Sequence, residues 1–548
     1  MKFKNTEIYI ILILIGALTG FSVSIFSLAL NYLTLLRESI SNTILYLIVV
    51  FLSIPLSYTI VQRFSDRKKT GSGLDNFLEA YHFKHGFVTL RTTFFSVLSS
   101  LLTIGLGGSA GPEGPGLTIG GGIGSWFAQK FKFDPETMKR LHIVGAAAGI
   151  AAIFHAPLAG TVFALEIPYL HDVETEVFIW ALITAIIAYG ITVIMTGPEQ
   201  LFPFESKTIT INTDIIFTSI ILGLLSAIVA LLFIHIYRVF KHGLTIIPKN
   251  ILPILGGLMI VLIGTYYPQV LGTGYDVIRG IGFGTLKVTF FLVFALLFMK
   301  IVATSVTLNT GGSGGLFVPS IFIGTMLGSV YYLSSNNFVT NIDYTIIIAI
   351  AIAGVFAATN KTLLTSIVLV GETFGPIVLM PAIISAIIAF LLTKNISIHE
   401  NQLPSKKTEK ELALTIFYHR VSKDTLRKIR ALQIMTKDPV YLDGRINIHE
   451  ALNKVKSYDF KVYPVTVDGK YIGYVTLDIL LMEPREKSVQ DVTILSDPIR
   501  PETTLHEIIE RMVSTKETHL YIVNNDNQLI GVVSQTDVIK TIFELANL

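Results

Sequence analysis

Charge is distributed very unevenly along this chain of 548 residues, and this limits its fold more than any other feature. Of its 81 Asp, Glu, Lys and Arg residues, 40 lie in residues 401–548, about 27% of that stretch, against about 10% in residues 1–400. An ordinary soluble domain carries roughly 25%. The first 400 residues therefore predict a polytopic all-α membrane protein, and the remainder predicts a soluble α/β module. The net charge of +3 is too small to suggest nucleic-acid binding.

Long stretches without charge mark the membrane spans, since a helix needs about 20 apolar residues to cross a bilayer. They are Ile8–Leu36, Ser39–Gln62, Val177–Pro198, Ile215–Ile234, Ile251–Tyr275, Ile301–Ile342 and, with Glu372 as its one charge, Thr362–Thr393. The N-terminal stretch is interpreted as a membrane helix because it lacks the cleavage pattern of a removed signal. Two segments, Gly105–Gly124 and Gly311–Gly328, are too rich in glycine to favour a straight helix.

The glycine-rich segments are copies of one another. Gly108–Ser125 aligns with Gly312–Ser329 at an offset of 204, and eight of the 18 residues are identical. We therefore expect the membrane domain, residues 1–404, to contain two inverted-repeat halves with broken helices, at about 1–200 and 215–400. Transporters built in this way place their site where the repeats meet. Close helix packing through small residues is the alternative role for these glycines.

A proline in each copy indicates the start of a helix, because proline fits the first helical turn. Gly111–Pro115 and Gly315–Pro319 thus predict two helix N-termini inside the membrane. The free N–H groups and the positive end of each helix dipole can bind an anion weakly enough for release. Glu113, the one ionisable residue of the first loop, is expected to compete with the anion and to act as a gate that leaves on protonation.

At these residues the sequence resembles the CLC family of chloride channels and chloride/proton antiporters. Gly71–Leu74 is similar to the family's GSGIP loop, Gly111–Pro115 to its G-[KR]-E-G-P loop, and Gly315–Pro319 to its G-x-F-x-P loop. The resemblance implies chloride as the substrate, with Glu113 as the gating glutamate and a serine that supports chloride over nitrate or fluoride. The chloride-binding residues that it implies are Ser72, Gly73, Gly114, Leu316, Phe317 and His399.

Three residues depart from the family's pattern around this site. Asp75 stands where the first motif usually has proline, and Pro112 replaces the basic residue of the second, so that a local positive charge is missing. His399 stands near the place of the last site residue, normally a tyrosine. It either donates to the anion, with a charge that varies near neutral pH, or merely ends a helix.

A fourth departure bears on the mechanism. Antiporters of this family usually carry an internal glutamate for proton passage, and the alignment places Ile167 there, directly after Glu166. Because isoleucine cannot carry a proton, a passive chloride channel gated by voltage or pH is favoured. A chloride/proton antiporter, in which Glu166 or water carries the proton, is the alternative. The resemblance further implies a homodimer, and we expect it in the plasma membrane with its N-terminus and soluble domains in the cytoplasm.

The soluble part contains a second internal repeat. After a charged linker at 405–428, two copies at 429–483 and 488–548 share a helix that begins near [IL]-H-E and a strand that ends in I-G-[YV]-V-[TS]. This resembles a tandem pair of CBS domains, which often bind adenine nucleotides such as ATP, ADP or AMP. The second copy matches the ribose-binding pattern with Gly531, Ser534 and Asp537, whereas the first copy is one residue short. A tail that only stabilises a dimer is the alternative.

Two other classes of protein fit this sequence less well than anion transport. A CBS-regulated cation transporter needs oxygen ligands in its spans, and Glu113, Glu166 and Glu372 are too few and too scattered in sequence to supply them. An enzyme needs a nucleophile–base pair, a metal cluster or a phosphate loop, and the sequence has no cysteine and no G-K-[ST] loop. We therefore expect no enzyme activity, no metal site and no required cofactor.

Overall fold

The computed structural model describes residues 5–198, 211–282, 285–286, 288–334, 342–406, 423–458, 460–515 and 517–545. The chain divides into two compact units, Met1–Ser405 and Lys406–Leu548. The larger unit is almost wholly helical, and the smaller one mixes helices and short strands.

The described part of the larger unit contains two successive sets of α-helices. The first set is α1 (Asn5–Glu38), α2 (Thr43–Phe64), α3 (Gly73–Phe83), α4 (Leu90–Gly105), α5 (Glu113–Lys130), α6 (Pro135–Phe154), α7 (Pro157–Glu166) and α8 (Phe178–Thr196). The second set is α9 (Thr213–Gly243), α10 (Leu252–Tyr266), α11 (Tyr275–Gly282), α12 (Phe290–Asn309), α13 (Phe317–Ser334), α14 (Tyr344–Asn360), α15 (Leu363–Phe374) and α16 (Leu379–Leu392).

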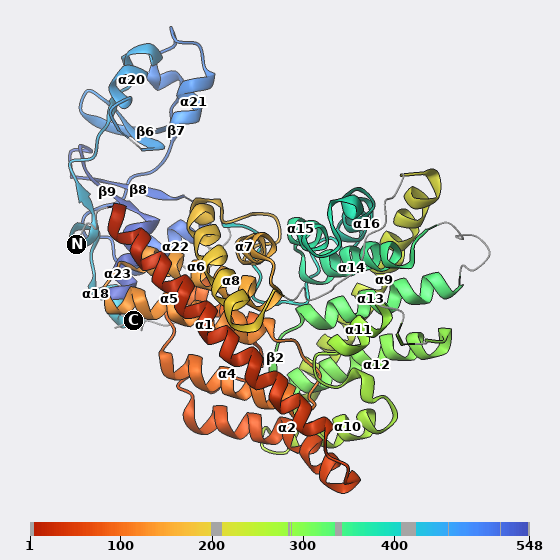
Figure 1. Cartoon of the computed structure of the whole chain (residues 1–548). Helices are drawn as coiled ribbons and strands as arrows, with labels where there is room; N and C mark the ends of the chain where they lie inside the picture. The colour runs from red at the N-terminus through yellow and green to blue at the C-terminus, as the bar shows by residue number, and fades with distance from the viewer. Residues whose placement is uncertain are drawn as a thin grey trace. The chain divides into compact units, whose positions relative to one another are not determined.

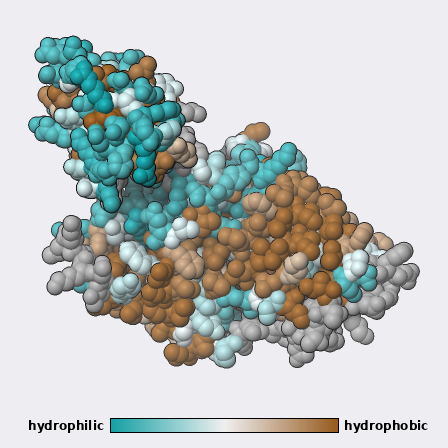
Figure 2. Space-filling view, turned by 90° about the horizontal axis from the view of Figure 1, so that it is seen from above, coloured by the Kyte–Doolittle hydropathy of each residue, from teal (hydrophilic) through white to brown (hydrophobic). Residues whose placement is uncertain are grey.

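Apolar helices with apolar outer faces make the larger unit an integral membrane domain. Seven helices in the described ranges are long and apolar enough to cross a membrane, and six shorter apolar helices accompany them. Helix α1 exposes Phe21 and Leu28, and α10 exposes Leu258 and Leu262. Figure 2 shows a broad hydrophobic area on one face of the molecule. Such a surface is stable in lipid and would aggregate in water.

The two halves are related by an approximate twofold axis, and a pair of equivalent hydrogen bonds between the halves follows it. Each residue of one bond lies 204 positions from its equivalent in the other. Thr103 Oγ1 accepts from Ser313 N, and Thr307 Oγ1 accepts from Ser109 N, both at 3.0 Å. In Figure 1 the red-to-yellow half and the green-to-teal half lie side by side, with strand β2 (Ser313–Gly314) where they meet. The predicted inverted repeat is thus confirmed, and so are the predicted helix starts, because α5 begins at Glu113 and α13 at Phe317.

The predicted span Ile301–Ile342 is divided between two helices in the structure. Helix α12 ends at Asn309 and α13 begins at Phe317, and the glycine-rich loop runs between them. Non-helical backbone at membrane depth is stable only where protein covers it. The loop residues from Gly311 to Leu316 are all buried, so this condition is met.

Glycines beyond these loops serve helix packing, which was the alternative role for them. A Cβ atom on Gly120 of α5 would lie 1.9 Å from the carbonyl oxygen of Gly145 on α6, and one on Gly149 would lie 2.0 Å from that of Gly116. Side chains at these positions would force the two helices apart. The glycine-rich segment therefore has two roles, since its beginning forms a loop and its remainder forms a helix interface.

The smaller unit consists of two α/β repeats that exchange their first strands. The strands are β3 (Thr436–Lys437), β4 (Leu442–Asp443), β5 (Val462–Val467), β6 (Lys470–Thr476), β7 (Ile494–Leu495), β8 (His519–Val523) and β9 (Leu529–Ser534). They form two sheets, with the orders β4-β5-β6-β7 and β3-β9-β8. Strand β3 of the first repeat thus joins the sheet of the second, and β7 of the second joins the sheet of the first. The repeat pattern in the sequence does not indicate this exchange.

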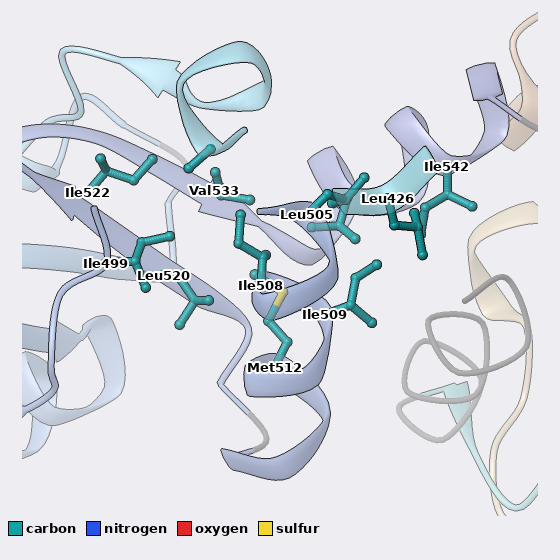
Figure 3. Close-up of a cluster of buried hydrophobic side chains, with 12 residues drawn as sticks. Leu426, Ile499, Leu505, Ile508, Ile509, Met512, Leu520, Ile522, Val533 and Ile542 are labelled. Carbon is teal, nitrogen blue, oxygen red and sulfur yellow. The ribbon is translucent and has the colours of Figure 1, made fainter. Parts of the chain in front are cut away.

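Helices cover these sheets and close two hydrophobic cores. They are α18 (Lys423–Lys428), α19 (Ala431–Ile434), α20 (Ile448–Val455), α21 (Leu477–Met482), α22 (Leu505–Thr515) and α23 (Gln535–Leu545). Helices α20 and α22 begin at the two predicted [IL]-H-E sites. Figure 3 shows the core of the second repeat, where Ile508 and Met512 of α22 face Leu520 and Val533. Leu426 belongs to this core, although it lies in the predicted linker 405–428, most of which lies outside the described residues.

Candidate functional site

Three loops from distant parts of the chain meet where the two halves join. Strand β1 (Gly71–Ser72) pairs in parallel with β2, so that Ser72 lies opposite Gly314. Gly111 and Gly315 exchange two backbone hydrogen bonds of 3.0 and 2.8 Å. The three segments singled out in the sequence are therefore brought together at one place, and their backbone groups hold them there.

Glycine is required where these loops approach one another. A Cβ atom on Gly73 would lie 2.7 Å from the Cα atom of Gly114, and one on Gly114 would lie 2.5 Å from the carbonyl oxygen of Gly314. No larger residue fits either position without moving backbone. Gly73 and Gly114, both predicted as site residues, thus let the three loops pack directly against one another.

Glu113 lies at the centre of this arrangement and is 1% exposed. Its Oε1 atom accepts a hydrogen bond from the backbone N–H of Phe317, at the start of α13. Its Oε2 atom is buried, and the described part of the protein offers it no hydrogen-bond partner. A carboxylate oxygen therefore lies at the N-terminus of α13, where a helix binds an anion.

The amide of Phe317 is held in an apolar environment. Its ring stacks on Phe154 with a centroid distance of 4.1 Å, and it makes edge contacts with Phe163 at 5.1 Å and Phe356 at 4.1 Å. Phe317 and Leu316 are 2% and 1% exposed. An N–H group in such surroundings interacts more strongly with an anion than it would in water. The Phe317 N–H group is thus a buried donor engaged by Glu113 Oε1.

Lys300 is a buried cation near this site that the sequence analysis missed. Its ammonium group on α12 donates to the carbonyl oxygens of Val270, Gly272 and Thr273 at 3.1, 3.0 and 3.3 Å. Three acceptors require three N–H donors, so the charged form satisfies them all. The charges of Lys300 and Glu113 act on one another. Lys300 thus supplies positive charge that Pro112 cannot. The sequence feature that could have identified Lys300 is its position directly before the uncharged stretch Ile301–Ile342.

Ser72 is the N-cap residue of α3. Its Oγ atom accepts from the backbone N–H of Asp75 at 3.3 Å, and the residue is 4% exposed. Because the oxygen serves as an acceptor in this contact, the hydroxyl proton is left to donate elsewhere. Ser72 can therefore donate to an anion while it caps the helix.

His399 lies beside the first loop, and both of its ring nitrogens contact protein oxygens. Nδ1 lies 3.1 Å from Asp75 Oδ1, and Nε2 lies 3.1 Å from Asn360 Oδ1. Its side chain is fully buried. In this arrangement neither nitrogen is left for an anion, so the expected direct contact would require one of these bonds to break.

Glu166, the alternative proton carrier, is held at the end of another helix. It accepts from the backbone N–H groups of Leu364 and Thr365, both at 2.8 Å, and from the Thr365 hydroxyl at 2.7 Å. These contacts cap the N-terminus of α15. Ile167, the next residue, is completely buried.

The predicted nucleotide residues of the smaller unit lie at the start of α23. Asp537 Oδ2 accepts from the backbone N–H and the hydroxyl of Ser534 at 2.9 and 2.7 Å. Gly531 lies in β9, where a Cβ atom would come within 2.4 Å of Met435 Sδ. One carboxylate oxygen of Asp537 is thus already engaged as a helix cap.

Comparison with known proteins shows the family. The family model described as "Voltage gated chloride channel" matches residues 53–394, and the CBS domain model matches residues 430–486 and 496–544. The chain belongs to the voltage-gated chloride channel family. Members of this CLC family are anion channels or transporters, and this protein carries two CBS domains after its membrane domain.

Similar proteins support this assignment. The "H(+)/Cl(-) exchange transporter ClcA" of Vibrio parahaemolyticus is 28% identical over 414 residues, which cover 71% of this chain and 86% of that protein. A crystal structure of a CLC-type fluoride/proton antiporter matches with a TM-score of 0.65 at 22% identity, over 74% of this chain and all of that one. A eukaryotic CLC transporter matches with a TM-score of 0.61 at 19% identity, over 96% of this chain and 97% of that chain. The two solved structures show that the fold is shared.

Proposed function

We propose that this CLC protein is a chloride channel of the plasma membrane, with one pore in each subunit of a homodimer and Glu113 as its gate. The observation that carries the proposal is the hydrogen bond from Phe317 N to Glu113 Oε1, because it puts a removable negative charge at a helix N-terminus. Protonation or displacement of the carboxylate would free the amides of Leu316 and Phe317 for chloride. Ser72, with its hydroxyl proton available, completes the site.

Conduction without proton coupling is favoured by the surroundings of Ile167. Isoleucine has no titratable group that could accept and release a proton. The neighbouring Glu166 accepts hydrogen bonds from three donors at the start of α15. The alternative is a chloride/proton antiporter, the activity for which the Vibrio relative is named.

Chloride efflux from liposomes distinguishes the two functions. The purified protein is reconstituted with a chloride gradient, and chloride and pH electrodes follow both ions. A channel dissipates the chloride gradient without moving protons against theirs. Stoichiometric proton uptake against its gradient would reject the channel and establish the antiporter.

Glu113→Gln tests the gate itself. The variant is expected to conduct at every pH and to lose the acid activation that Glu113 causes. Glu372→Gln is the matched control, since Glu372 is also a carboxylate within the membrane domain but accepts from Leu158 N and Ala159 N instead. If Glu113→Gln keeps the full wild-type pH dependence, Glu113 is not the gate.

The CBS pair is proposed to lie in the cytoplasm together with the N-terminus and to regulate conduction by binding an adenine nucleotide. Ser534 and Asp537 are the residues proposed to contact the ribose, since they lie at the start of α23 in the repeat with the complete pattern. A change of chloride flux on addition of ATP, ADP or AMP would support this role.

A further inference from the structure

Two residues that depart from the family's pattern, Asp75 and His399, are in direct contact. They are separated by 324 positions in the sequence, and the nitrogen–oxygen distance between them is 3.1 Å. The His399 side chain is fully buried, and that of Asp75 is 14% exposed. An ion pair in such a position is stable only with further hydrogen bonds around it.

Asn360 contacts the second ring nitrogen of His399. Its side-chain nitrogen donates to Phe356 O at 3.3 Å, so its side-chain oxygen must face His399 Nε2. Both ring nitrogens of His399 therefore face oxygen acceptors. The doubly protonated imidazolium is the form that donates to both of them.

Asp75 also connects His399 to the candidate anion site. Its backbone N–H donates to Ser72 Oγ at 3.3 Å, and its side chain accepts from His399. Asn401 Nδ2 donates to the backbone oxygen of Asp75 at 3.1 Å. The first turn of α3, which includes the Ser72 cap, is thus held by the segment that contains His399.

Other charged groups face the pair from α9 and from Glu400, the residue directly after His399. Lys241 Nζ lies 3.8 Å from Asp75 Oδ2 and 2.8 Å from Glu400 Oε2. His242 contacts Glu400, and the charges of Asp75 and Glu400 act on the buried Tyr237. Arg238 donates to Ser397 O at 2.7 Å. When His399 is neutral, Asp75 keeps only Lys241, at a longer distance, as a cationic partner among these groups.

We propose that the His399–Asp75 pair is a second proton-controlled element of the anion path, separate from Glu113, and that His399 acts on Ser72 through Asp75. The protonated pair holds α3 in place and neutralises Asp75, so anions reach Ser72. When His399 loses a proton to water, one of its ring nitrogens no longer carries a hydrogen and faces the oxygen of Asp75 or Asn360 without a hydrogen bond. The negative charge of Asp75 beside the anion site is then no longer neutralised by His399. Anion flux then falls. His399 is a positioning residue in this scheme, and the scheme rests on the proposed anion conduction.

The test uses chloride efflux from liposomes at symmetric pH, between about pH 5 and pH 8, the range in which histidine side chains change charge. Full-length Glu113→Gln serves as the background, because the titration of the gate is absent there. In this background flux is expected to fall roughly tenfold as pH rises and the controlling proton is lost. Adding His399→Gln should make the profile flat, and adding Asp75→Asn should shift the fall toward lower pH.

His242→Gln in the same background is the matched control. This histidine also faces a carboxylate, but it is more exposed and contacts Glu400 instead of Asp75. The pH dependence of chloride flux in the double variant should therefore equal that of Glu113→Gln alone. The proposal is overturned if chloride flux through Glu113→Gln does not change with pH, or if adding His399→Gln leaves the fall of flux with rising pH unchanged. If His399→Gln is not a homogeneous protein, an unshifted Asp75→Asn profile overturns it. Absence of chloride flux in the wild-type protein would overturn both proposals, whereas flux with an unaltered His399→Gln profile overturns this one alone.

Discussion

Glu166 and Glu372 each cap the helix that carries the other. Glu166, the last residue of α7, accepts from two backbone N–H groups at the start of α15. Glu372, near the end of α15, accepts from Leu158 N at 3.0 Å and Ala159 N at 2.7 Å at the start of α7. The twofold relation of the two halves is therefore expressed in two reciprocal carboxylate caps. Since these carboxylates satisfy backbone donors, we expect them to stabilise the fold.

Glu166→Gln is expected to destabilise the membrane domain by about 1–3 kcal/mol, because an amide offers one acceptor where two backbone N–H groups need acceptors. Glu372→Gln should cost less, since Glu372 is less buried than Glu166. Thermal unfolding in detergent measures both effects. Chloride efflux per folded protein should be unchanged, and a selective change in proton movement by stable Glu166→Gln protein would contradict this account.

Gly120→Ala is expected to prevent normal folding, because the added methyl group would lie 1.9 Å from the carbonyl oxygen of Gly145. Overpacking an interior typically costs about 1–3 kcal/mol, and a contact this short with rigid backbone should lie at the upper end of that range. Gly190→Ala is the control, since a Cβ atom on that glycine of α8 meets nothing within 4 Å. Size-exclusion profiles and melting temperatures should show that little folded Gly120→Ala protein forms, whereas Gly190→Ala should behave like the wild-type protein. Equal stability of the two would contradict the packing role.

The sequence predicted the halves, the helix starts and the meeting of the three loops, because motifs and an internal repeat are local features. It did not predict how side chains far apart in sequence satisfy one another. Pro112 suggested a missing positive charge, but Lys300 comes close to Glu113 only through the packing of α12. In the same way, Asp75 and His399 were each visible as departures, and only the fold showed that they pair. The exchange of β3 and β7 between the CBS repeats likewise depends on strands that are far apart in sequence and pair only in the folded unit.

Lys300→Met is expected to weaken both stability and anion binding. The carbonyl groups of Val270, Gly272 and Thr273 would lose their shared donor, at a cost of about 1–3 kcal/mol for buried acceptors. Positive charge near the site would also be lost, so half-maximal flux should need roughly fivefold more chloride, about 1 kcal/mol of binding energy. Lys300→Arg keeps the charge and is the control. A chloride dependence that Lys300→Met leaves unchanged would show that the lysine is structural only.

The smaller unit should lose stability as pH falls. Burial lowers the pKa of His519 below its ordinary value of 6.5, and the charge of Asp537 opposes this effect only partly. The unfolded chain therefore binds a proton that the folded unit does not, so stability is full above the unfolded pKa and declines as pH falls toward the folded one. His519→Gln should make denaturant midpoints less dependent on pH below about 6.5. If the denaturant midpoint of the wild-type protein rises as pH falls below about 6.5, the predicted direction of the pH dependence is wrong.

Asp537→Asn is expected to weaken the proposed adenine-nucleotide binding to the CBS pair without unfolding it. The asparagine oxygen can still accept from Ser534 and keep the cap of α23, whereas the charge that favours ribose hydroxyl donors is lost. Affinity for ATP, ADP or AMP, measured by calorimetry, should fall at least roughly tenfold, about 1.4 kcal/mol. Asp478→Asn is the matched control, since it lies in the repeat whose ribose pattern is one residue short. Absence of heat with all three nucleotides for the wild-type protein would instead support a CBS pair that only stabilises a dimer.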